Sequence, residues 1–235
     1  MKLQTITTIE LSSKCNLNCR YCIQSQLRVA PERKPDIMTD DVFYASLDVV
    51  KALMKRGTQR ELNLNGNGES TLDPDLPQRV RAVKDLMQDE ILQFCTNGVG
   101  VTRELLIKLK DAGVDRIDVS PHSAFNARRV VEYLRQLGIP GVVNFGAILD
   151  SHNWAGQLPD DAALDEVRIE LPCHPLIEGR GYIQSEGNIT PCCYDFRNLG
   201  VFGTVWDIDL LEREIKPFEL CETCHQTIPE GMFNA

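Results

Sequence analysis

Short strand-like and helix-like segments alternate along the first two thirds of the chain, and this alternation is the feature that most limits the fold. It indicates βαβ crossovers and therefore a mainly parallel sheet. The expected strands are Thr5–Leu11, Leu62–Leu64, Ile91–Cys95, Arg116–Val119, Val142–Phe145 and Val167–Leu171. The expected helices are one capped by Thr39 and ended by Gly57, then Pro77–Met87, Thr102–Lys110 and Ala127–Leu137. Residues 146–166 show no long amphipathic period, so the pattern does not indicate whether a helix fills this crossover.

A loop with three cysteines follows the first expected strand. Cys15, Cys19 and Cys22 have the spacing C-x3-C-x2-C. Three thiolates from one loop can hold three irons of a four-iron, four-sulfur cube and leave the fourth iron open to a small molecule. A zinc site is the alternative, but no fourth Cys or His follows within the next twenty residues to close it.

The cysteine spacing, with Tyr21 directly before the third cysteine, resembles that of the radical S-adenosylmethionine enzymes. The resemblance implies an α/β fold, a partial parallel (β/α)6 TIM-like barrel. It also implies that S-adenosylmethionine binds at the open iron of a 4Fe-4S cluster. One electron from the cluster would then give a 5'-deoxyadenosyl radical, which abstracts hydrogen from a substrate.

The loop after the second expected strand, Asn65–Glu69, resembles the Gly-Gly-Glu motif of that family, with Asn67 in place of the first glycine. Glycine lets backbone approach a ligand, and Glu69 can pair with an ammonium group. The cofactor-binding residues that the resemblance implies are Tyr21, Gly66, Asn67, Gly68, Glu69, Ser120 and Asn144. A turn role for Ser120 and a buried, satisfied Asn144 are the alternatives, and Asn97 either forms an Asn-Gly turn or faces the same cavity.

Five of the nine cysteines lie after Pro172, in a segment with little periodic apolar sequence. Such a segment needs a metal to stabilise it, so we expect a barrel domain over residues 1–171 and a small domain over 172–235 that contains a hairpin at Gly181–Thr190. The cysteine spacing resembles the SPASM signature and its shortened relative, the twitch domain. This implies an auxiliary 4Fe-4S cluster held by Cys173, Cys192, Cys221 and Cys224. Cys193 could replace Cys192, and a structural zinc is the alternative.

The charge balance argues against a nucleic-acid surface. The chain has 25 Lys and Arg against 34 Asp and Glu, a formal net charge of -9, and its basic residues are scattered. No apolar run approaches the ~20 residues of a membrane span, and no signal peptide opens the chain. The odd number of cysteines at metal-loop spacings favours a reducing compartment, so a cytoplasmic protein is expected.

A ribosomally made precursor peptide is the expected substrate, because enzymes with SPASM or twitch clusters often modify such peptides by crosslinking, epimerisation or backbone excision. The first strand begins within five residues of Met1, so a separate small peptide-recognition protein is an expected partner, together with an electron donor such as flavodoxin or ferredoxin. One alternative is a twitch-type dehydrogenase that oxidises an alcohol on a small molecule. Another is a non-enzymatic iron-sulfur electron carrier. No catalytic acid or base is predicted.

Overall fold

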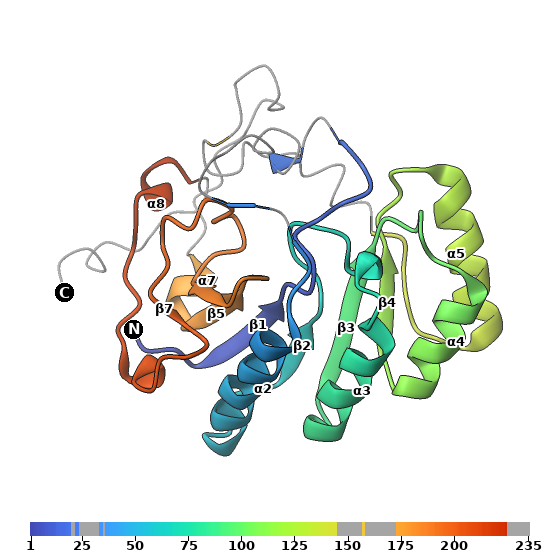
Figure 1. Ribbon diagram of the computed structural model, residues 1–235. Helices are drawn as coiled ribbons and strands as arrows, with labels where there is room; N and C mark the ends of the chain where they lie inside the picture. Colours follow the sequence, from blue (N-terminus) through green and yellow to red (C-terminus); the bar gives the residue numbers. More distant parts are fainter. Residues whose placement is uncertain (20–21, 24–32, 35, 145–156, 158–172, 225–235) are drawn as a thin grey trace.

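A seven-stranded sheet forms the centre of the protein (Figure 1). The computed structural model describes residues 1–19, 22–23, 33–34, 36–144, 157 and 173–224. The strands are β1 (Thr5–Ile9), β2 (Glu61–Asn63), β3 (Ile91–Thr96), β4 (Arg116–Val119), β5 (Arg180–Ile183), β6 (Asn188–Thr190) and β7 (Gly203–Thr204). Their order in the sheet is β4-β3-β2-β1-β5-β6-β7. Strands β1 to β5 pair in parallel, whereas β6 and β7 pair antiparallel, so the predicted α/β class is confirmed.

Four long helices connect the parallel strands and lie side by side along one face of the sheet (Figure 1). They are α2 (Asp40–Lys55), α3 (Leu76–Leu86), α4 (Arg103–Ala112) and α5 (Ala124–Leu137). The predicted cap at Thr39 is confirmed, because its side chain accepts a hydrogen bond from the backbone N–H of Val42. The short helices are η1 (Ser70–Leu72), α7 (His174–Ile177), η2 (Leu210–Glu212) and α8 (Leu220–Thr223). None of the described helices combines the length and apolar composition needed to cross a membrane.

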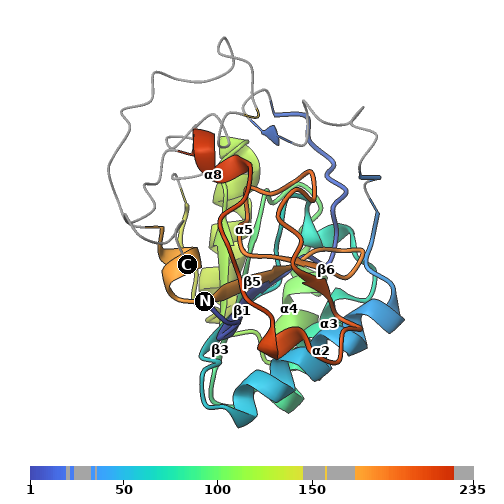
Figure 2. The same cartoon turned by 90° about the vertical axis from the view of Figure 1, so that its left-hand side faces the viewer.

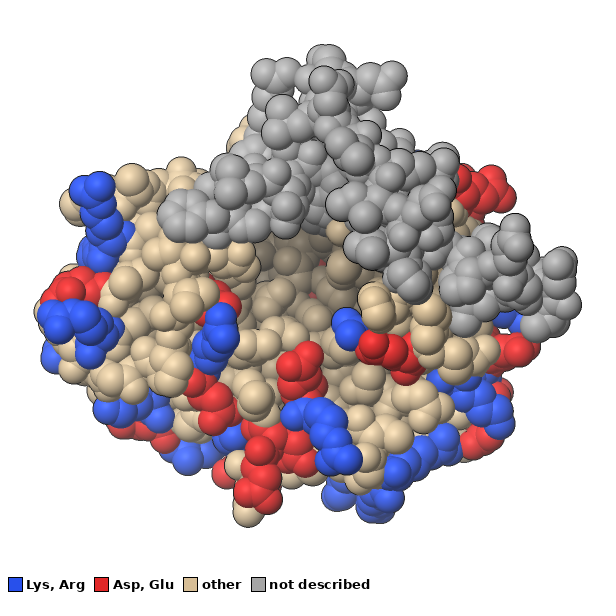
Figure 3. Space-filling model, turned by 180° about the vertical axis from the view of Figure 1, so that it is seen from behind, with Lys and Arg blue, Asp and Glu red and all other residues tan. Residues whose placement is uncertain are grey.

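The two faces of the sheet differ in character. Residues of one face, such as Leu62, Leu92 and Ile117, are fully buried in the apolar core with the helices. Because side chains alternate along a strand, the neighbouring Asn63 and Gln93 point to the opposite face, where they are half-buried. Figure 3, seen from behind, shows a hollow on this side of the molecule. We call the face opposite the helices the inner face.

The end of the predicted barrel differs from expectation. Val143 makes only a single parallel bridge to Val119, so the strand expected at Val142–Phe145 is not formed over the described residues. A side-chain bond helps to explain this, because the backbone N–H of Val142 donates to the carboxylate of Asp118 (3.0 Å). The strand expected at Val167–Leu171 lies outside the described residues.

The segment after Pro172 extends the same sheet. Strand β5 pairs in parallel with β1, and β6 folds back on it, which confirms the predicted hairpin; Figure 2 shows β5 beside β1. Gly181 permits this pairing, since a Cβ there would come within 2.7 Å of side-chain carbons of Ile6 and Leu3. The division into two domains near Pro172 stays a prediction.

Candidate functional site

The loops that follow β1, β2, β3 and β4 meet at one edge of the sheet, because parallel strands end at the same side. Buried Glu69, in the loop after β2, links this loop to the loops after β1 and β3. It accepts hydrogen bonds from the Thr96 hydroxyl (2.7 Å) and the Asn97 backbone N–H (2.8 Å), both at the end of β3. The backbone N–H of Glu69 donates to the carbonyl of Lys14 in the loop after β1 (2.7 Å). Both carboxylate oxygens are thus engaged by protein donors, and Glu69 shapes the site.

The glycines of the β2 loop allow this close approach. A methyl group on Gly68 would overlap the carbonyl oxygens of Ser12 and Lys14 at the start of the cysteine loop. Asn67 lies between the two glycines, and its backbone N–H donates to Glu10 (2.8 Å). Its side-chain Nδ2 is buried and has no hydrogen-bond partner within the described part of the chain. An N–H donor in this position suits a ligand that offers an acceptor.

The three-cysteine loop contacts the ends of β3 and β4. The side-chain Nδ2 of Asn97 lies 3.8 Å from Cys15 Sγ, and Nδ1 of His122 lies 3.8 Å from Cys19 Sγ. Cys22 closes a turn by donating its N–H to the Cys19 carbonyl (3.1 Å). Burial raises the pKa of Cys15, so metal binding there would release a proton. Over the described residues, no three His, Cys, Asp or Glu side chains converge as the ligands of a single metal ion do.

The other residues predicted to bind the cofactor, Ser120, Asn144 and Tyr21, differ in burial and in whether the structure describes them. Ser120 is buried at the end of β4, and its hydroxyl lies 3.1 Å from Cys95 Sγ. Asn144 is exposed, which contradicts the alternative of a buried asparagine, and its backbone N–H donates to Val119 (2.8 Å). Tyr21 lies outside the described residues.

His122 was missed by the sequence analysis, although it follows the end of β4 by only three residues. Burial lowers the pKa of His122 more than the nearby Glu69 raises it, so the ring is neutral near pH 7. The only signal that could have found it was its position directly after a strand of the parallel sheet.

A buried ion-pair network next to the site was also missed. Arg33 donates a hydrogen bond to the carboxylate of Glu10, which is fully buried at the end of β1. It donates two more to the carboxylate of Glu186 in the β5–β6 turn, at 2.7 Å and 2.8 Å. Burial opposes the charge of Arg33, but Glu10 and Glu186 together raise its pKa. Since Glu10 also accepts the N–H of Asn67 and that of Ser185, this network joins the glycine loop to the C-terminal hairpin.

The C-terminal thiols are close enough to influence one another. Burial, with smaller contributions from Cys173 and Cys224, raises the pKa of Cys221 to about 11. A hydrogen bond with Cys193, burial and the nearby Cys224 raise the pKa of Cys192. The loop that carries Cys192 is held by buried Asp195, whose carboxylate accepts three hydrogen bonds of 2.8 Å from the Thr190 hydroxyl and the backbone N–H groups of two later residues.

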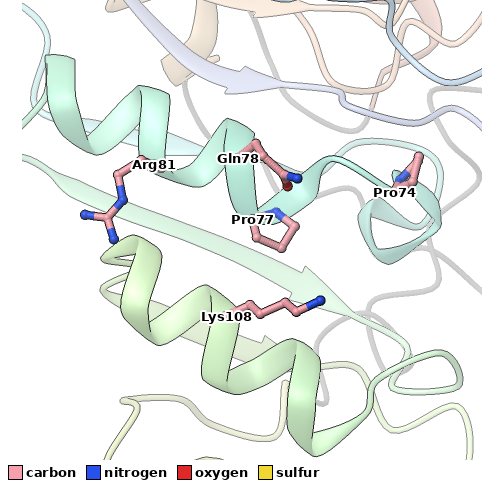
Figure 4. A pocket seen from close by; sticks show the side chains of 5 residues that line it. All are labelled: Pro74, Pro77, Gln78, Arg81 and Lys108. Atoms are coloured by element: carbon pink, nitrogen blue, oxygen red, sulfur yellow. The ribbon is translucent and has the colours of Figure 1, made fainter.

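A separate hollow of about 410 Å³ lies between α3 and α4, on the helix side of the sheet (Figure 4). Pro74, Pro77, Gln78, Arg81 and Lys108 line it. None of the predicted site residues is among them, so this hollow is distinct from the loops at the strand ends.

Comparison with known proteins identifies the family of the site. The sequence model described as the Radical SAM superfamily matches residues 9–156. The chain is 34% identical to a GTP 3',8-cyclase of Streptomyces coelicolor over 119 residues, which are 51% of this chain and 33% of that protein. It is 30% identical to the GTP 3',8-cyclase of Rippkaea orientalis over 149 residues, 63% of this chain and 41% of that protein. The chain thus spans less than half the length of these relatives.

Solved structures agree on the fold. A crystal structure of BtrN in complex with AdoMet and 2-DOIA superposes with a TM-score of 0.69 at 20% identity, over 87% of this chain and 79% of that chain. BtrN in an open conformation superposes with a TM-score of 0.60 at 17% identity, over 87% and 76% of the two chains. At this identity the likeness concerns the fold alone.

The relatives overturn the prediction of a peptide substrate. The two GTP 3',8-cyclases are named for a reaction on a small molecule. The chain is also 32% identical to the molybdenum cofactor biosynthesis protein 1 of Drosophila melanogaster over 116 residues, which are 49% of this chain and 19% of that protein. That protein is likewise named for the synthesis of a small molecule. The prediction that the chain modifies a ribosomally made peptide was therefore wrong, and the expectation of a peptide-recognition partner rested on it. The comparisons also bring no support for a SPASM or twitch domain.

Proposed function

The chain belongs to the Radical SAM superfamily, and we propose that it abstracts a hydrogen atom from a polar small molecule. Family membership implies S-adenosylmethionine and a 4Fe-4S cluster, which together supply the 5'-deoxyadenosyl radical when bound. The observation that carries the proposal is the packing of the three-cysteine loop against the ends of β3 and β4, beside the glycine loop of β2.

The residues at this edge fit the two groups. Cys15, Cys19 and Cys22 would hold the cluster, since three thiolates leave one iron for S-adenosylmethionine. Asn67 would donate its unpaired Nδ2–H to the bound cofactor, while Gly66 and Gly68 keep the loop close to the start of the cysteine loop. Tyr21, Ser120 and Asn144 remain candidates for further contacts to the cofactor.

The inner face of the sheet supports a polar substrate. Asn63 and Gln93 are half-buried there in adjacent positions of β2 and β3. The amide of Gln93 makes no hydrogen bond within the described part of the chain, and Asn63 uses its N–H₂ group on the carbonyl of Thr7 (3.0 Å), which leaves its oxygen to accept. These groups would recognise hydroxyl, amine or amide groups of a substrate held below the strand ends.

The charges of the same face bear on the choice of substrate. A triphosphate needs cationic partners. On this face of the described strands β1 to β4 the basic residue is Arg116, and it already forms a two-pronged pair with Asp118 (2.8 Å and 2.9 Å). We therefore favour the uncharged polar part of a small molecule as the group that this face binds. GTP is the first compound to assay, because the relatives are named for it.

An auxiliary cluster is part of the proposal. Cys173, Cys192, Cys221 and Cys224 would hold a second 4Fe-4S cluster. The effect of Cys224 on the pKa of Cys192, and of Cys173 and Cys224 on that of Cys221, supports their proximity. Four thiolates close such a cluster, so its role would be electron transfer. A one-electron donor such as a flavodoxin or ferredoxin would reduce the enzyme.

Isotope transfer from a cell extract tests the substrate class even while the substrate itself is unidentified. Metabolites from cells grown in heavy water are separated from macromolecules by ultrafiltration, and each fraction is added to the anaerobically reconstituted protein with S-adenosylmethionine and a reductant. The proposal predicts deuterium in the 5'-deoxyadenosine formed with the metabolite fraction. Deuterium transfer from the macromolecular fraction alone would contradict it. A Gln93→Leu variant is expected to raise the substrate concentration needed for half-maximal transfer, whereas Gln136→Leu on the exposed side of α5 leaves it unchanged.

A further inference from the structure

Two side chains from neighbouring strand ends reach the sulfur atoms of the three-cysteine loop. Asn97, after β3, places Nδ2 3.8 Å from Cys15 Sγ. His122, after β4, places Nδ1 3.8 Å from Cys19 Sγ. Both distances lie within the range of hydrogen bonds to the larger sulfur atom. Neither residue belongs to the cysteine loop, and they contact different thiols.

The orientation of the Asn97 amide is set by its other partners. Its Oδ1 accepts the backbone N–H of Val99 (2.9 Å), so the Nδ2 group must face the cysteine loop. One N–H of that group donates to Oδ1 of Asn16 (2.7 Å), and the second is available for Cys15. The residue is only 5% exposed, and its backbone N–H is held by Glu69. Asn97 is therefore a rigid donor aimed at a thiol.

His122 is placed by the turn after β4. Its backbone N–H donates to the carbonyl of Ser120 (2.9 Å), and Ser120 in turn donates its own N–H to Thr96 at the end of β3 (2.9 Å). The backbone that carries the ring is thereby held against the end of β3, next to Asn97. A thiolate only accepts hydrogen bonds, so a ring nitrogen beside it serves as the donor.

We infer that Asn97 and His122 donate hydrogen bonds to two of the thiolates that would hold the open cluster, and that they raise its reduction potential. The inference rests on the proposed function. Reduction adds one electron and makes the cluster and its thiolates more negative, so N–H donors stabilise the reduced state more than the oxidised state. The electron comes from an external one-electron donor of the flavodoxin or ferredoxin class. Both residues are positioning residues, because they act through cysteines.

A redox titration of the reconstituted holoprotein, followed by electron paramagnetic resonance, measures this effect directly. The signal that changes on addition of S-adenosylmethionine identifies the open cluster among the iron-sulfur signals. His122→Phe keeps an aromatic ring without an N–H, and Asn97→Leu keeps the shape without an amide. Only part of the strength of a hydrogen bond to a charged group differs between the two redox states. We expect the ratio of reduced to oxidised cluster at fixed potential to fall roughly tenfold per lost donor, which for one electron is about 59 mV.

Two further variants separate this role from a structural one. His122→Gln retains an N–H donor and is expected to restore most of the potential, which mere packing would not explain. Gln136→Leu removes an amide on the exposed side of α5, where the side chain bonds Glu132, and it is expected to leave the potential unchanged. Because Asn97 also bonds Asn16 and Val99, the His122 series stands as an independent test if the Asn97 variant fails to fold.

The outcomes distinguish the inference from the function on which it rests. A lower potential in His122→Phe, recovered in His122→Gln, supports the inference. If the S-adenosylmethionine-responsive signal is present but its potential is the same in all variants, the inference is wrong while the proposed function stands. If the native protein shows no such signal, both are overturned.

Discussion

Replacement of Arg33 by methionine is expected to destabilise the protein strongly, although Arg33 belongs to no motif. The guanidinium side chain is 2% exposed and bonds Glu10, which is 0% exposed, and Glu186. It also lies over the Phe196 ring, 5.4 Å from its centre. Methionine has a similar length and can fill the space, so the main loss is the charge that balances Glu10.

The size of the expected loss in unfolding free energy follows from the full burial of Glu10, the partner of Arg33. Removing one member of a buried ion pair costs about 3–5 kcal/mol, because an uncompensated charge stays in the interior. For a chain of this size about 1 kcal/mol shifts the melting temperature by roughly 2–4 °C, so we expect a loss of roughly 6–20 °C. Thermal unfolding followed by circular dichroism, under anaerobic conditions, measures it.

Two controls isolate the cause. Arg135→Met removes an arginine of an exposed pair with Glu132 on α5, and the expected loss is below about 1 kcal/mol. The double variant Glu10→Gln with Arg33→Met removes both buried charges and is expected to recover a large part of the stability. A melting temperature of Arg33→Met equal to that of Arg135→Met would refute the reasoning.

The remaining predictions concern the glycine loop, pH and iron. Gly68→Ala forces a methyl group onto backbone carbonyl oxygens of the cysteine loop and should abolish the change that S-adenosylmethionine causes in the cluster signal; Gly100→Ala, where a Cβ lies 3.4 Å from its nearest neighbour, should not. The pKa of Glu186 is raised by burial but lowered further by Arg33, to a net value below its ordinary one. Its contribution to stability is therefore fully present above the ordinary pKa of about 4.3 and is lost as pH falls below it. The difference in unfolding free energy between the native chain and Glu186→Gln should shrink as pH falls below that value, as denaturant titrations would show. Cys221→Ala should lower the iron content by about four atoms per chain in a colorimetric assay, and Cys95→Ala should leave it unchanged; equal iron in both would contradict the auxiliary cluster.

Sequence patterns correctly predicted those helices and strands that are determined by residues close together in the chain. The helix after Thr39 has an N-cap, two acidic residues in its first turn and an apolar stripe, and it forms as expected. Likewise β4 begins and ends at the predicted residues, Arg116 and Val119. The pairing of β5 with β1 could not be predicted in this way, because it joins residues about 175 positions apart. It also depends on the missing side chain of Gly181, which lets β5 lie against Ile6 and Leu3.

In the site, too, residues in short motifs could be predicted from the sequence, whereas single residues outside such motifs could not. The cysteine loop and the glycine loop have spacings that reflect close approach of backbone and ligand, and they lie together at one sheet edge. His122 and Arg33 carry no such spacing, since a single side chain that reaches across strands leaves no periodic trace. The substrate class was predicted wrongly because the motifs concern the cofactor, whereas the side chains that we propose for substrate binding are isolated residues of the inner face.

The most direct test of the central claim is the amount of 5'-deoxyadenosine formed from S-adenosylmethionine by the iron-loaded protein under anaerobic, reducing conditions. The account predicts that the native chain forms it and that a variant with Cys15, Cys19 and Cys22 all replaced by alanine does not, while its C-terminal iron is retained. If the triple variant forms as much as the native chain, or if the fully loaded native chain forms none, the three-cysteine loop does not perform this chemistry.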